Sequence, residues 1–251
     1  MKRFIAIFTI FIATSVGSLA AEGINFTVGA TGALGLFDAA GKETLRGTHI
    51  IDRNNSDGDS NTFNDTKTTS KTEDDMFLGY GAVMVELGAD AIPGLRIGLE
   101  YVPYNMESEI TENKRNDKIA GTDQGSESAN TDTGTSKVSV DLENYMTAYL
   151  AYHLPTEIGS VFIRGGIITA DLITQENLVT GSQYGNASLD GTLIGAGIEY
   201  GLDDGMFIRG EVNQTSFDNI KLTNTGSENN NTIDVTNLSG NSVALTIGKT
   251  F

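Results

Sequence analysis

The chain contains eight segments in which apolar and polar residues alternate. The final segment, "NSVALTIGKTF", places Val243, Leu245 and Ile247 on one face and small or hydroxyl-bearing residues on the other. A period of two is typical of a β-strand whose two sides meet different surroundings. We therefore expect strands at residues 25–37, 76–90, 95–105, 138–154, 160–173, 190–202, 206–217 and 239–251.

The connections between these segments alternate strictly between short and long. Residues 91–94, 155–159 and 203–205 are short and carry the turn residues Pro, Gly and Asp. The other connections are long, polar and rich in Asn, Ser, Thr, Asp and Gly, and they cover residues 38–75, 106–137, 174–189 and 218–238. This asymmetry predicts an all-β fold, an eight-stranded up-and-down antiparallel barrel. Outer-membrane barrels show the same asymmetry, with short periplasmic turns and long extracellular loops.

Alternation alone fits two kinds of barrel. A soluble lipocalin-like barrel keeps its apolar side chains inside, whereas a membrane barrel turns them towards lipid. The charged strand residues share the polar face, and they are Glu86, Arg96, Glu100, Arg164, Glu199, Arg209 and Glu211, joined by Asp141 and Glu143. An arginine that faces lipid near the midplane costs about 2–4 kcal/mol. In a membrane, these charges must therefore face the lumen.

The N-terminus favours the membrane alternative. Two basic residues precede an apolar run that ends in "GSLAAEG", the pattern of a secretory signal peptide cleaved after Ala20 or Ala21. The apolar run is too short for a membrane anchor, which needs about 18 or more residues. We expect residues 1–20 to be removed and residues 21–251 to form the barrel.

Aromatic residues mark one level of the apolar face. Phe26, Tyr152, Tyr200 and Phe251 all fall at the short-turn end, in the outward phase. Aromatic rings favour the interface between membrane and water, so these residues predict a periplasmic girdle. Lys249 lies close enough to this level for its ammonium group to reach headgroups or water.

The pattern resembles the small OmpA-like outer-membrane β-barrel family of Gram-negative bacteria. Besides the strands, the resemblance rests on "FIRGGI", "LIGAGIEYGL" and "FIRGEV", and on Phe251, which resembles the C-terminal assembly signal of outer-membrane proteins. It covers residues 25–251 and implies location in the cell outer membrane. The implied partners are outer-membrane lipid, lipopolysaccharide and the barrel-assembly machinery. The peptidoglycan-binding role of the larger family members is not implied for this barrel.

The lumenal charges are the candidate functional site. All seven lie near the short turns, and Glu199 falls opposite Arg209 if residues 202 and 206 pair. An eight-stranded barrel is just wide enough for its own side chains to fill it. Two interpretations remain open, a packed plug of salt bridges and a narrow ion path gated by the same network.

The composition of the chain limits the classes of ligand and of chemical site that it can have. With 16 Lys and Arg against 33 Asp and Glu, the chain lacks the clustered basic residues that bind nucleic acid. It contains no cysteine, so it has no disulfide framework and no thiolate site. The stretch "DRNNSDGDS" does not fit an EF-hand, because Arg53 stands where the first carboxylate ligand is needed. Weak binding of divalent cations by this acidic loop remains open.

Catalysis has little support in the sequence. A hydrolase needs a base beside a nucleophile, yet the only histidines are His49 and His153, which we expect at opposite ends of the barrel. We expect no enzyme activity, no cofactor and no metal site. The favoured function is a mainly structural membrane barrel with at most a narrow passive pore. The alternative is a surface recognition protein, of adhesin or phage-receptor type, that acts through its long loops.

Overall fold

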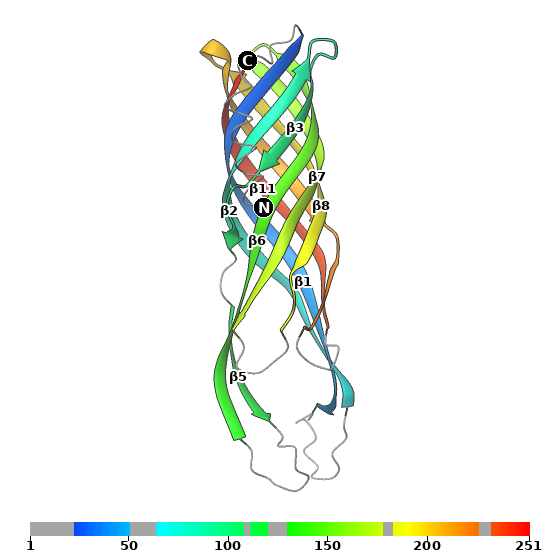
Figure 1. The fold of residues 1–251 in the computed structure, drawn as a ribbon. Helices are drawn as coiled ribbons and strands as arrows, with labels where there is room; N and C mark the ends of the chain where they lie inside the picture. The colour runs from blue at the N-terminus through cyan, green and yellow to red at the C-terminus, as the bar shows by residue number, and fades with distance from the viewer. Residues whose placement is uncertain (1–22, 51–63, 108–110, 120–129, 178–182, 226–231) are drawn as a thin grey trace.

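The computed structural model describes residues 23–50, 64–107, 111–119, 130–177, 183–225 and 232–251. These residues form one antiparallel sheet that curls into an elongated barrel (Figure 1). Its strands are β1 (Ile24–Ile50), β2 (Asn64–Ala89), β3 (Leu95–Tyr101), β4 (Met106–Glu107), β5 (Thr111–Ile119), β6 (Asn130–Thr156), β7 (Gly159–Asn177), β8 (Ala187–Gly201), β9 (Met206–Phe217), β10 (Ile220–Thr223) and β11 (Thr232–Thr250). No helix in this part of the chain is long and apolar enough to cross a membrane. The expected signal peptide, residues 1–20, lies outside the described residues.

Eight strands make up the wall of the barrel. They follow the order β1-β2-β3-β6-β7-β8-β9-β11, and β11 pairs with β1 from Thr27↔Thr250 to Thr44↔Thr232, which closes the sheet. The three remaining strands add to this wall, because β4 and β5 pair with β6, and β10 pairs with β11. The predicted fold, an eight-stranded up-and-down antiparallel barrel, is confirmed.

Tight turns gather at one end of the barrel, beside the end of β11 (Figure 1). They join β2 to β3, β6 to β7, and β8 to β9, the last through a 3-10 turn at Asp203–Gly205. Gly94 has a φ of 84°, and a Cβ there would lie 2.3 Å from the carbonyl oxygen of His153. Only glycine fits such a position without a shift of the backbone.

The strands run much further at the opposite end than the alternating pattern predicts. β1 extends to Ile50, and β5 pairs with the first part of β6, from Thr111↔Val138 to Ile119↔Asn130. Parts of residues 38–75 and 106–137 are thus paired strand rather than loop, which corrects the expectation. Alternation identifies a strand only where its two faces meet different surroundings. These Thr-, Ser- and Asn-rich stretches lack that contrast, so their sequences resemble loops.

Alternate residues separate cleanly into exterior and lumen. Val243, Leu245 and Ile247 are 56%, 57% and 52% exposed, whereas Arg164 and Glu211 are only 5% and 6% exposed. In the part of the barrel near the short turns, apolar side chains therefore lie outside and charged ones inside. This orientation is that of the membrane barrel and excludes the lipocalin-like alternative, which would reverse both sets.

One irregularity changes the phase of β6. The pairing with β7 shifts between Glu143 and Met146, and Asn144 adopts a positive φ of 53°. The extra residue of such a bulge reverses the alternation beyond it. Leu142, which the sequence pattern places on the same face as Met146, accordingly packs against the buried apolar cluster inside the barrel.

Candidate functional site in the barrel lumen

The seven charged residues of the candidate site all point into the lumen. They are Glu86 on β2, Arg96 and Glu100 on β3, Arg164 on β7, Glu199 on β8, and Arg209 and Glu211 on β9. The sequence places all seven near the short turns, and in the structure they form two layers along the barrel axis. Every second residue of a strand faces inward, so a second charge on the same strand lies one or two inward positions further from the short turns. Glu211 therefore lies further from the short turns than Arg209.

The first charge layer lies next to the short turns and consists of Glu86, Arg96, Glu199 and Arg209. Arg209 lies at its centre, with Nη1 2.8 Å from Glu86 Oε1 and Nη2 2.6 Å from Glu199 Oε2. Arg209 and Glu199 also stand directly opposite each other in the pairing of β9 with β8. Charge-assisted bonds at these distances are the strong class of hydrogen bond.

Arg96 completes the first layer from β3. Its Nη1 lies 3.1 Å from Glu86 Oε2, and its Nη2 lies 3.1 Å from Glu199 Oε1. Each carboxylate is therefore shared by two guanidinium groups, and the layer contains equal numbers of positive and negative groups. Arg96 has a side-chain exposure of 21%, so it is the member nearest to water. This layer joins β2, β3, β8 and β9 across the lumen.

The second charge layer consists of Glu100, Arg164 and Glu211. Arg164 Nη1 lies 3.2 Å from Glu100 Oε2, and its Nη2 lies 2.7 Å from Glu211 Oε1. Asn213 supports both partners, because its Oδ1 accepts from Arg164 Nε and its Nδ2 donates to Glu211 Oε1. Glu211 Oε2 is buried without a hydrogen-bond partner in the described part of the chain.

Tyr149 connects the two layers. Its hydroxyl donates to Glu86 Oε1 at 2.9 Å, and its ring lies 4.9 Å from the Arg164 guanidinium carbon. The ring has room only because residue 98 is glycine, since a Cβ there would lie 2.2 Å from Tyr149 Cζ. A cation over an aromatic face is favourable, more so when desolvated. One aromatic side chain thus fixes the spacing of the two layers.

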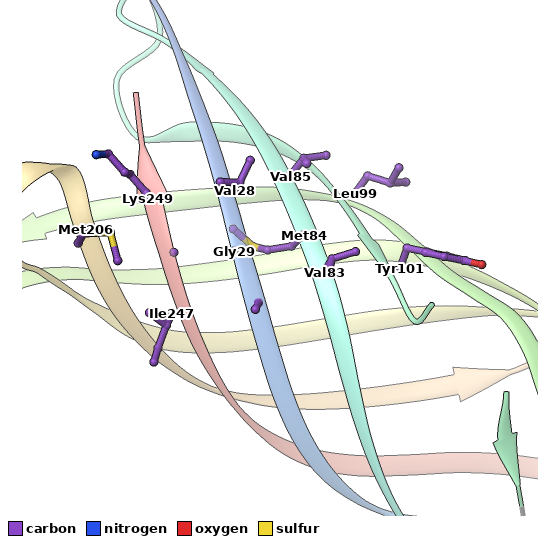
Figure 2. Close-up of a pocket in the computed structure, with 12 residues that line it drawn as sticks. Val28, Gly29, Val83, Met84, Val85, Leu99, Tyr101, Met206, Ile247 and Lys249 are labelled. Atoms are coloured by element: carbon purple, nitrogen blue, oxygen red, sulfur yellow. The ribbon is translucent and has the colours of Figure 1, made fainter. Parts of the chain in front are cut away.

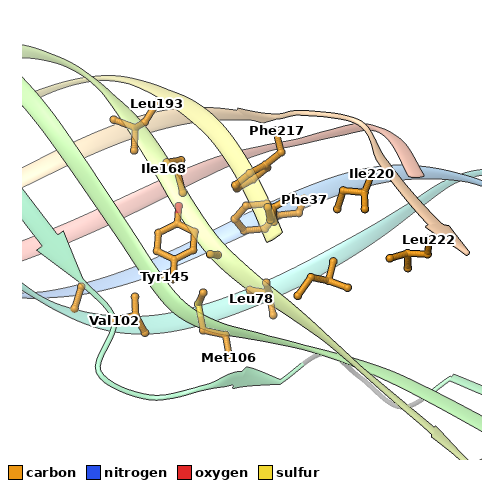
Figure 3. Close-up of a cluster of buried hydrophobic side chains, with 14 of the residues drawn as sticks. Phe37, Leu78, Val102, Met106, Tyr145, Ile168, Leu193, Phe217, Ile220 and Leu222 are labelled. Atoms are coloured by element: carbon orange, nitrogen blue, oxygen red, sulfur yellow. The ribbon is translucent and has the colours of Figure 1, made fainter. Parts of the chain in front are cut away.

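A buried apolar cluster fills the lumen beyond the charge layers. Figure 3 shows its side chains converging from strands around the wall, with Phe37, Tyr145 and Phe217 among them. Its other members are Leu78, Ala82, Val102, Met106, Ile168, Ala170, Leu172, Tyr184, Leu189, Leu193, Ile220 and Leu222. The sequence pattern did not predict this cluster, because the inward face of the strands was expected to be polar. Leu193, an apolar residue on the inward face of the expected strand 190–202, was the available signal.

His153 lies inside the barrel beside the first charge layer. Its Nδ1 is 3.1 Å from Ser160 Oγ and 3.9 Å from Glu199 Oε1, and its ring stacks on Phe162. A catalytic triad uses opposite ring nitrogens for the nucleophile and for the orienting carboxylate. Here both groups approach Nδ1, so the three residues do not have triad geometry. His49 belongs to the far extension of β1, at the other end of the barrel.

The expected girdle residues lie at the short-turn end. The backbones of Phe26 and Phe251 hydrogen-bond to each other at 2.8 and 3.2 Å, and Tyr152, Tyr200 and Phe251 are 45%, 56% and 50% exposed. Their role at a membrane interface remains a prediction. Within the described ranges, no group of three or more His, Cys, Asp and Glu residues is arranged to hold a metal ion.

Comparisons with known proteins give structural likeness alone. No protein-family model matches the chain, and no curated protein matches it. Neisserial surface protein A is 12% identical, over 87% of this chain and 97% of that chain, with a TM-score of 0.37. OprG from Pseudomonas aeruginosa is 11% identical, over 90% of this chain and 95% of that chain, with a TM-score of 0.43. The outer membrane protease OmpT from Escherichia coli is 9% identical, over 92% of this chain and 98% of that chain, with a TM-score of 0.38. These scores carry no argument about function.

The apolar outer surface of the closed barrel indicates where in the cell the protein is located. In hydrocarbon, every backbone polar group must find an internal partner, which a closed barrel provides. Exposed residues such as Ile163, Ile167 and Ile198, at 65%, 67% and 65%, form the outward apolar band. A closed antiparallel barrel with this exterior and a charged lumen is the architecture of outer-membrane proteins. The protein is located in the bacterial outer membrane.

Proposed function

We propose that this chain is a structural outer-membrane barrel with a closed lumen. The observation that carries the proposal is the stack of three blocking elements along the axis, namely two charge layers and the apolar cluster. Water and ions would have to separate Arg209 from Glu86 and then cross a region lined by residues such as Leu189 and Leu193. An eight-stranded barrel whose own side chains fill it has no open channel.

The stack also favours the plug interpretation over the gated path. Conduction requires sites that an ion can enter and leave easily. Arg164 and Arg209 are held by two carboxylates each, at distances between 2.6 and 3.2 Å, and both are almost fully buried. The apolar cluster then adds a second barrier that does not depend on charge.

Conductance in planar bilayers tests this proposal. We expect no steady current from the unmutated chain, and a large steady current would contradict a closed lumen. Arg209→Ala, Arg164→Ala or Leu193→Ala alone leaves the other two blocking elements in place and should remain closed. The triple variant weakens all three elements and should admit measurable current. A general porin inserted under the same conditions provides the positive control.

The resemblance to small OmpA-like barrels supports a matching set of partners. These are outer-membrane lipid, lipopolysaccharide and the barrel-assembly machinery, which would read the strand that ends at Phe251. Binding of the purified assembly machinery to a peptide of residues 239–251, compared with the same peptide carrying Phe251→Ser, tests the last partner. Equal binding of both peptides would show that Phe251 is not part of the signal that the assembly machinery recognises.

Surface recognition is the second candidate, and the extended strands favour it. β1 continues to Ile50, and the β5–β6 pairing carries the chain far beyond the band (Figure 1). Paired strands hold a surface in one shape at a lower entropic cost than a flexible loop. Replacing residues 111–138 with a short turn should then abolish phage adsorption or adhesion to cell monolayers while the barrel still folds. Binding that persists without residues 111–138 would show that these residues are not the recognition surface.

A further inference from the structure

The outer surface of the barrel contains a hollow of about 370 Å³ near the short-turn end. Its floor consists of small or branched side chains on the neighbouring strands β1 and β2, namely Val28, Ala30, Val83 and Val85. Register explains the arrangement, because Val28 pairs with Val85, and Ala30 pairs with Val83. These four residues thus form a low patch between longer neighbours.

Longer side chains form the two walls. On one side Lys249 pairs with Val28, and Ile247 pairs with Ala30; on the other side Leu99 and Tyr101 pair with Val85 and Val83. Figure 2 shows Lys249, Met206 and Ile247 on one side of the valines and Leu99 and Tyr101 on the other. The hollow is therefore a trough whose lining is almost wholly apolar, with one cation at its rim.

Lys249 gives the trough its chemical selectivity. It lies two residues before Phe251, and its ammonium nitrogen is 5.3 Å from the centre of the Phe251 ring. Among the described residues at this end, Lys249 is the only outward cation, and no described carboxylate pairs with it. The turn residues nearby, Asp90, Asp203 and Asp204, are acidic and exposed. Among the outward side chains that the structure describes at this end, Lys249 is therefore the one that attracts an anionic group.

We propose that this trough is a binding site for one phospholipid of the periplasmic leaflet, with an acyl chain along Val28, Ala30, Val83 and Val85 and its phosphate at Lys249. The occupant must be apolar because the trough opens onto the lipid-facing band. It must also carry a negative group at the interface, where the lysine ammonium lies. A second copy of the chain fits less well, because a symmetric contact across this trough would bring two Lys249 side chains together.

Native mass spectrometry of the delipidated full chain in detergent tests the site. The probes are dioleoylphosphatidylglycerol and dioleoylglycerol, which carry the same acyl chains with and without the phosphate. We expect one phosphatidylglycerol to bind more tightly than dioleoylglycerol. Lys249→Gln should weaken phosphatidylglycerol binding about fivefold and leave dioleoylglycerol binding unchanged. Lys221→Gln, which removes an exposed cation at the opposite end, should change neither.

A matched pair of valines tests the trough itself. Val83 and Val161 are 41% and 42% exposed, and both face outward, but only Val83 lines the trough. Val83→Phe should fill the trough and weaken phospholipid binding about tenfold, whereas Val161→Phe should have no effect. Three results would each overturn the proposal. The first is an equal effect of Val83→Phe and Val161→Phe on phospholipid binding, and the second is unchanged phosphatidylglycerol binding by Lys249→Gln. The third is a dimer of the unmutated chain that Val83→Phe abolishes. Heat-modifiable migration verifies that every variant is folded.

Discussion

Arg209 and Glu86 meet across the lumen, with Arg209 Nη1 2.8 Å from Glu86 Oε1. Their strands, β9 and β2, are not neighbours in the sheet, because β11 and β1 lie between them. The pair therefore links parts of the wall that no ladder of backbone hydrogen bonds connects directly. Both residues are 1% exposed, so salt in the surrounding water screens the interaction little.

Arg209→Ala should strongly destabilise the barrel. It leaves Glu86 and Glu199 with only Arg96 as a cationic partner, and breaking a buried ion pair costs about 3–5 kcal/mol. Urea unfolding in lipid vesicles measures the loss. Lys221→Ala is the control, because its contact with Asp234 is 3.7 Å long and exposed, and such pairs contribute only about 0–1 kcal/mol. Similar losses for both variants would show that the lumenal pair contributes little.

Two adjacent residues on β8 lie on opposite sides of the barrel wall, one in the apolar cluster and the other on the lipid-facing surface. Leu193 is 3% exposed inside the barrel, and Ile194 is 63% exposed outside. Leu193→Ala should cost about 2–5 kcal/mol, because it leaves a cavity among packed neighbours. Ile194→Ala should cost less, because lipid chains can occupy the vacated space. The free energy of unfolding in vesicles measures both, and a larger loss at Ile194 would contradict the cluster.

Single cysteines test the orientation directly, because the natural chain contains none. Leu245→Cys should be modified in lipid vesicles by a carbene released by light from a lipid-dissolved diazirine, which inserts into the S–H bond of a neutral thiol, and Thr246→Cys should not, since Leu245 is 57% exposed and Thr246 only 2%. A water-soluble maleimide should leave both unmodified but should label Lys221→Cys. Reaction at residue 246 with protection at 245 would reverse the assignment of lumen and exterior.

Glycine positions distinguish packing inside the barrel from space outside it. Gly98→Ala would place a Cβ 2.2 Å from Tyr149 Cζ, and overpacking of this kind costs about 1–3 kcal/mol. Tyr149 cannot move freely, because it donates to Glu86 and carries Arg164 over its ring.

Gly32 provides the matched comparison, because nothing lies within 4 Å of a Cβ there. Gly32→Ala should be neutral or slightly stabilising, by about 0.4–1 kcal/mol, since it reduces the entropy of the unfolded chain. Urea midpoints of the two variants measure the contrast. A Gly98→Ala midpoint equal to that of Gly32→Ala would show that Tyr149 is not confined.

The strands within the membrane band could be predicted because lipid and lumen impose opposite demands on alternate residues. Ile247 and Thr246 illustrate the contrast, since one faces lipid and the other a filled interior. The extensions beyond the band, such as β5, could not be predicted in this way. Their alternate residues show no contrast between apolar and polar, and only the pairing with β6 reveals that the polar stretch at residues 111–119 is a strand.

The sequence by itself determined an eight-stranded barrel, from a period of two and from connections that alternate between short and long. It also placed Glu199 opposite Arg209, because a short turn specifies the register of the two strands that it joins. Alternation separated the two faces of each strand, and the charged residues indicated which face is the lumenal one. Only the tertiary structure decided that Glu86 reaches Arg209 across two intervening strands, that the charges divide into two layers, and that an apolar cluster packs in the lumen further from the short turns. These contacts depend on the curvature and stagger of the closed sheet, which bring distant strands face to face and which no local pattern encodes.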